Sequence, residues 1–135
     1  EDRLLHRLIL AAAFAVLPSL VSALTLECSM KPSNAGGGYI TETYVLLHDE
    51  SSGKALASDG LIQHFNGGPI DAKVTDDTAK KLVMTWTVTI TNSTGQPAVM
   101  RFRASYFKAT RQITIRAMPG GYDNNFEGRG VCKSV

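Results

Sequence analysis

The clearest pattern in the chain is an alternation of apolar and polar residues over residues 82–91, which read LVMTWTVTIT. Threonine occupies every second position from Thr85 to Thr91, and apolar residues lie between them. Successive side chains of a β-strand point to opposite faces, so this pattern predicts a strand with one buried face. An α-helix would instead distribute the threonines around its circumference.

Two more segments alternate in the same way, 99–107 (VMRFRASYF) and 111–118 (RQITIRAM). A cluster of turn-forming residues, 92–97, separates the first strand from the second, and a shorter turn near 108–110 separates the second from the third. The three segments therefore predict an antiparallel meander.

The remaining strands are predicted from weaker patterns. Residues 24–30 and 126–132 alternate at the two ends of the predicted domain, and 39–48 is predicted as a long, bulged strand. Shorter strands are expected at 54–58, 60–65 and 69–75. Seven to nine strands with no helix after residue 23 predict an all-β domain. We expect a small antiparallel β-barrel, with a two-sheet β-sandwich as the alternative.

The first 23 residues are typical of a signal peptide. Arg3 and Arg7 precede the apolar run 8–17, and the small residues of 21–23 provide a cleavage site. The apolar run is too short for a bilayer-spanning helix, which needs about 20 residues. The sequence therefore predicts one domain at 24–135, exported to the periplasm or the extracellular space and without a membrane span.

The two cysteines, Cys28 and Cys132, lie in the first and last predicted strands. Because exported proteins meet an oxidising environment, we expect a disulfide between them that closes the barrel. Gly128 and Gly130 share the face of Cys132, and the gap they leave is expected to accept Trp86.

Composition and motifs exclude several functions. The chain has 14 basic and 12 acidic residues, and this small excess gives no indication of nucleic-acid binding. It has no recognisable nucleophile motif, phosphate-binding loop or metal-ligand spacing, so we expect neither an enzyme nor a metal or cofactor site. Asn92-Ser93-Thr94 forms a glycosylation sequon at a predicted hairpin tip.

Two groups of side chains are candidates for binding. Glu42, Tyr44 and His48 share one face of the predicted 39–48 strand. If that face points inward, they and Trp86 could orient a small apolar or amphipathic ligand inside the barrel. If it points outward, they are solvated residues of an edge strand.

The second group consists of Arg101, Arg103 and Arg116, which project from the outer face of the predicted meander. Arginine suits bidentate contacts with anions, so this face could bind an anionic partner of the cell envelope, or it could serve solubility alone. A binding module for a small ligand is the leading expectation, and an interaction or inhibitor module using the basic face is the alternative.

Overall fold

The computed structural model describes residues 23–121 and 124–135, so the predicted signal peptide lies outside the described residues except for Ala23. The described chain forms nine strands, one short 3-10 helix and one α-helix. The strands are β1 (Leu24–Met30), β2 (Thr43–Asp49), β3 (Lys54–Asp59), β4 (Ile70–Asp71), β5 (Lys73–Asp77), β6 (Lys81–Thr91), β7 (Pro97–Phe107), β8 (Gln112–Pro119) and β9 (Phe126–Ser134). The helices are η2 (Asn34–Gly36) and α2 (Gly60–Asn66).

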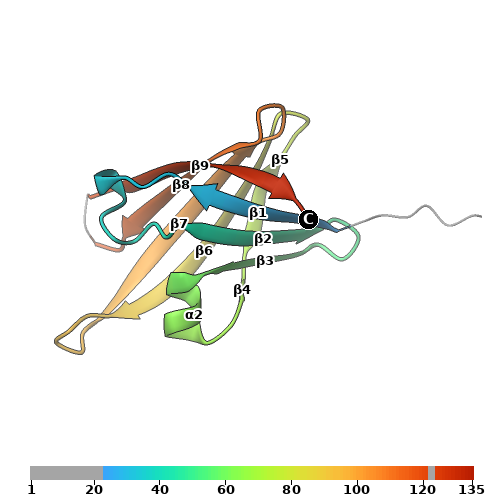
Figure 1. The fold of residues 1–135 in the computed structure, drawn as a ribbon. Helices are drawn as coiled ribbons and strands as arrows, with labels where there is room; N and C mark the ends of the chain where they lie inside the picture. The colour runs from blue at the N-terminus through green and yellow to red at the C-terminus, as the bar shows by residue number, and fades with distance from the viewer. Residues whose placement is uncertain (1–22, 122–123) are drawn as a thin grey trace, which may run out of the picture.

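The strands form one antiparallel sheet in the order β4-β3-β2-β1-β9-β8-β7-β6-β5. The predicted meander is confirmed, because β6, β7 and β8 are joined by hairpins in full register. The last strand, β9, lies between β8 and β1, which brings the two ends of the domain side by side. Figure 1 shows the sheet curling round on itself.

A bent segment, β4–β5, connects the two edges of the sheet. Ile70 pairs with Ala57 of β3, and the Ala72 N–H donates to the Ala55 carbonyl oxygen at 2.9 Å. The next residues, Lys73–Asp77, pair with β6 instead. The predicted barrel is therefore confirmed in a nearly closed form, and the sandwich alternative is not observed.

The predicted disulfide is also confirmed. Cys28 and Cys132 face each other across β1 and β9 and are bonded through their sulfur atoms. Both are buried in the core. The bond therefore joins the first and last strands at the point where they pair.

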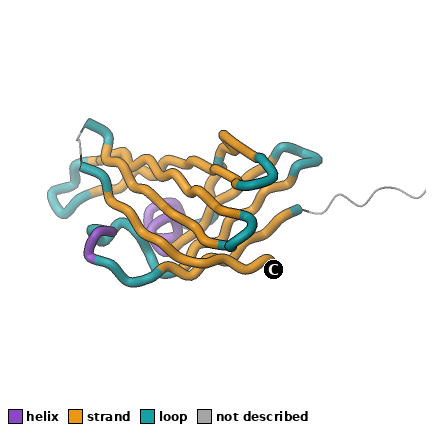
Figure 2. The backbone as a smooth tube through the Cα atoms, turned by 90° about the horizontal axis from the view of Figure 1, so that it is seen from above, coloured by secondary structure: helices purple, strands orange, loops and turns teal. Residues whose placement is uncertain are grey.

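The expectation that no helix follows residue 23 was wrong. Residues 60–65 were predicted as a strand, but they belong to α2. The Asp59 carboxylate accepts the Ile62 N–H at 2.8 Å as an N-cap, and Gly67 ends the helix in the left-handed conformation. Ile62 is fully buried, and α2 contacts β3 and β6. Such a short helix is stable here because its apolar side is buried against these strands. Figure 2 shows both helices, η2 and α2, in purple.

The interior of the barrel is filled by side chains. Trp86 stacks on Phe102 with ring centroids 5.7 Å apart, and the Tyr44 ring lies 6.1 Å from that of Trp86. The inward positions predicted for 82–91, 99–107 and 111–118 are buried. The alternation of these strands therefore identifies the core correctly.

The expected contact between Trp86 and the two glycines of β9 was wrong. Met30 and Ile40 occupy the space beside Gly128, and the neighbouring strand itself approaches Gly130 through Ser29 and Met30. The glycines allow β1 and the chain after η2 to come close, which only the pairing of β1 with β9 could reveal.

Two strand boundaries also differ from the prediction. The segment predicted at 39–48 becomes a strand only at Thr43, and 69–75 is divided between β4 and β5. Among the described residues, no helix combines the length and the apolar character that crossing a membrane requires.

Candidate functional site

The structure places the residues of the first predicted group at different depths in the barrel. Glu42 precedes β2 and is exposed, whereas Tyr44 is fully buried. Trp86 is a core residue, and His48 is half-buried near the end of β2. The face of β2 that was considered inward is indeed inward at Tyr44 and Leu46, and it becomes only partly buried at His48.

Tyr44 takes part in a buried polar network that joins β2 to α2. Its hydroxyl oxygen accepts the Thr41 N–H at 3.2 Å, and the Thr41 hydroxyl donates to the Asp59 carboxylate at 2.6 Å. Asp59 in turn caps α2 and is only 6% exposed. These contacts satisfy polar groups that would be costly to bury alone.

The network predicts a loss of stability at alkaline pH. Burial, together with the nearby charge of Asp59, raises the pKa of Tyr44 to about 12 from its ordinary value of 10.0. Because the folded pKa is raised, stability is complete below pH 10 and falls as the pH rises toward 12, by roughly 2–3 kcal/mol. The free energy of unfolding, measured between pH 8 and 12, should fall less steeply for Tyr44→Phe than for the wild type. Equal slopes would contradict this assignment.

The second predicted group lies together on the outside of the barrel. Arg101 and Arg103 of β7 and Arg116 of β8 are exposed, and Arg129 of β9 projects on the same side. We call these four residues the basic face. Within residues 23–121 and 124–135, Arg116 is the one member of this group that forms an ion pair.

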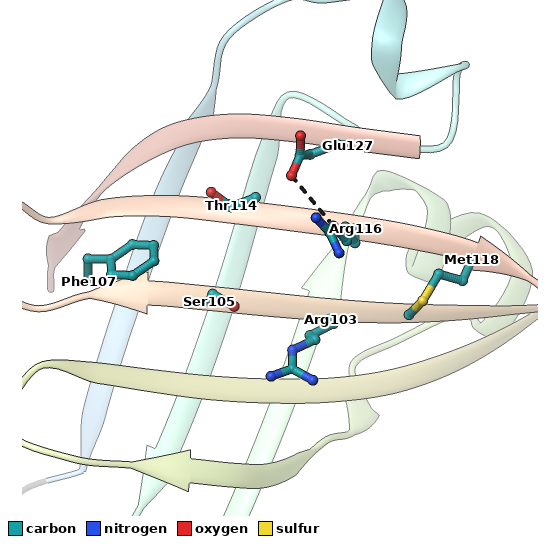
Figure 3. A pocket seen from close by; sticks show the side chains of 7 residues that line it. All are labelled: Arg103, Ser105, Phe107, Thr114, Arg116, Met118 and Glu127. Atoms are coloured by element: carbon teal, nitrogen blue, oxygen red, sulfur yellow. Dashed lines mark ion pairs between the residues drawn. The ribbon is translucent and has the colours of Figure 1, made fainter. Parts of the chain in front are cut away.

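Arg103 and Arg116 lie directly opposite each other across β7 and β8 (Figure 3). Like charges in this cross-strand position destabilise a sheet. Glu127 is the next residue in the same row, and its carboxylate lies 3.5 Å from Nε of Arg116. Both partners are exposed, so this ion pair stabilises the sheet little. The single carboxylate of Glu127 also leaves the two guanidinium groups with a net positive charge.

A hollow of about 410 Å³ lies over these residues. Its lining combines three chemistries: the charged row of Arg103, Arg116 and Glu127, the hydroxyl pair Ser105 and Thr114, and the apolar side chains of Phe107 and Met118. Ser105 and Thr114 are cross-strand partners in the row next to the two arginines. Guanidinium and hydroxyl donors are thus available side by side at the surface.

Two more hollows continue the surface across β9 toward β1. One, of about 330 Å³, shares Phe107 and Thr114 with the first and includes Arg129. The other, of about 310 Å³, lies between Lys31 and Glu127 and also includes Arg129. Lys31 and Arg129 are adjacent because the Lys31 N–H donates to the Arg129 carbonyl oxygen at 2.8 Å.

The sequence identified three of the four arginines of the basic face but not the complete surface. Arg129 alternates with the buried glycines of β9, so its outward direction was predictable. Its position beside Thr114 was not predictable, because the sequence does not show that the last strand, β9, pairs with β8. For the same reason, the contact between Arg116 and Glu127 could not be predicted.

Chemically, the basic face can hold an oxyanion through several donors at once. Each guanidinium presents a planar set of N–H groups that suits phosphate, sulfate or carboxylate oxygens.

Comparison with known proteins adds no functional assignment: no protein-family model, curated protein sequence or solved structure matches this chain.

Proposed function

We propose that this chain is an exported, non-enzymatic binding module that recognises an anionic partner through the basic face. The partner carries phosphate or sulfate groups. Each such group has several acceptor oxygens and can therefore accept hydrogen bonds from more than one guanidinium. The disulfide between Cys28 and Cys132 is compatible with export, since such bonds persist in oxidising compartments.

The observation that carries the proposal is the opposition of Arg103 and Arg116 beside a 410 Å³ hollow. Two cations held opposite each other cost stability in the free protein, and an anion bound between them would remove that cost. Ser105 and Thr114 add neutral donors, and Phe107 and Met118 offer apolar contact to the body of the partner.

The leading expectation from the sequence places a small apolar or amphipathic ligand inside the barrel. That hypothesis stays a prediction, and the close packing of Tyr44, Trp86 and Phe102 favours the outer surface over the interior. Native mass spectrometry of protein purified from its own host tests it. A mass that falls by a few hundred daltons on denaturation would support the interior ligand, because that is roughly the mass of a small ligand that fits such a site.

The basic face is tested by titration with a heparin tetrasaccharide as a sulfated probe. We expect saturable binding, with shifts of the backbone amide signals in 103–105 and 114–116. Arg103→Gln combined with Arg116→Gln should weaken binding by about tenfold or more, since each removes a charge-assisted hydrogen-bond donor.

A matched control separates a site from net charge alone. Lys54→Gln combined with Lys80→Gln removes the same formal charge from exposed positions outside the hollow. The proposal requires the control to keep wild-type affinity. Equal weakening in both double variants would show that the probe senses total charge, and an absence of binding to the wild type would also overturn the proposal.

A further inference from the structure

Three side chains of metal-binding type converge where the two edges of the sheet approach each other. His48 lies near the end of β2, Glu50 follows in the turn to β3, and Asp77 ends β5. One ligand atom from each lies within 4.8 Å of the others. Because β2 and β5 are not neighbours in the sheet, closure of the barrel alone brings these groups together.

The His48 imidazole is the least exposed member of this cluster. Its side chain is 11% exposed, and in the described part of the chain its ring forms no hydrogen bond. Nδ1 lies 3.8 Å from Oδ2 of Asp77, which is too far for a hydrogen bond. Donor atoms around a tetrahedral zinc ion are separated by about 3.3 Å, a value that follows from metal–ligand bonds of about 2.0–2.1 Å. The observed separation of 3.8 Å is within about 0.5 Å of that of two zinc ligands.

Lys108 holds Asp77 in position for such a role. Its Nζ donates to Oδ1 of Asp77 at 2.6 Å, which leaves Oδ2 directed toward His48. The ammonium group also introduces a positive charge close to the cluster. It therefore orients one ligand while it opposes the charge of a bound cation.

We propose that His48, Glu50 and Asp77 bind a zinc ion, with water at the fourth position. One imidazole nitrogen with two carboxylate oxygens is a donor set that suits zinc, and the exposure of Glu50 and Asp77 leaves room for solvent. The ion would link the turn between β2 and β3 to β5 across the gap between the sheet edges. This site departs from the expectation of no metal, which rested on ligand spacing along the chain.

Isothermal titration of the untagged, metal-free protein with zinc chloride tests the proposal. We expect one equivalent to bind with micromolar affinity, and cobalt to give the visible absorption of a tetrahedral site. His48→Ala should lower the affinity by about tenfold or more. His64→Ala is the matched control, because His64 is exposed on α2 and outside the cluster.

A further variant keeps the proposal testable if His48→Ala fails to fold. Glu50→Gln alters an exposed ligand and should weaken binding. Zinc should also raise the melting temperature of the wild type, because it binds the closed barrel. Absence of zinc binding, or binding unchanged in His48→Ala and Glu50→Gln, would overturn the proposal.

Discussion

Replacing Cys28 and Cys132 with alanine is expected to lower the free energy of unfolding by about 4–5 kcal/mol. The bond spans a sequence separation of 104 residues, so it removes much conformational freedom from the unfolded chain. Domains of this size are stable by only about 5–15 kcal/mol in total. The double variant should therefore unfold at a much lower urea concentration than the wild type.

Equilibrium unfolding in urea, followed by Trp86 fluorescence, measures this effect. Unfolding of the wild type in urea with a reductant present is a second test of the same effect. Because Cys28 and Cys132 are buried, the reductant should break their bond mainly in the unfolded chain and so favour unfolding. A loss of less than about 1 kcal/mol would contradict the expectation that the bond is a main determinant of stability. It would mean that strand pairing alone closes β1 onto β9.

Replacing Gly130 with alanine is expected to cost about 2–3 kcal/mol, because the strands β1 and β9 would have to move apart. A Cβ atom at this position would meet the Ser29 carbonyl oxygen and the Met30 backbone. Backbone atoms of a paired strand cannot turn aside as a side chain can. The variant should therefore lose stability at the same junction that the disulfide holds.

Gly128→Ala provides the comparison for this prediction. Its Cβ would meet side-chain atoms of Ile40 and Met30, which can adjust, so the expected loss is smaller, about 1 kcal/mol. Urea unfolding of both variants measures the difference. Equal losses at the two positions would show that the backbone approach at Gly130 is not the limiting contact.

The long strands could be predicted because their signal is local. Residues 82–91, 99–107 and 111–118 alternate strictly, and the structure buries the faces that the alternation assigns to the core. The helix α2 was missed because its seven residues give too short a pattern to distinguish from a strand. Its capping residues, Asp59 and Gly67, were the available signal.

The candidate sites were predictable only as far as a single strand or hairpin extends. Alternation places Arg101 and Arg103 on one outer face, and the short turn at 108–110 brings Arg116 to the same face. Glu127 and Arg129 join this face only because β9 pairs with β8. Alternation could not show that Glu42 is exposed and His48 half-buried, because burial depends on where β2 begins and ends in the barrel.

The sequence by itself therefore determined the all-β class, the meander, the outward arginines and the pairing of the two cysteines. These features depend on period-two alternation, on turn residues and on a choice between only two thiols. Only the tertiary structure decided how the barrel closes, which places His48 beside Asp77 and Arg116 beside Glu127. Those contacts join residues that are distant in sequence. They depend on the register of strands that pair only in the closed barrel, and a local sequence pattern does not contain that information.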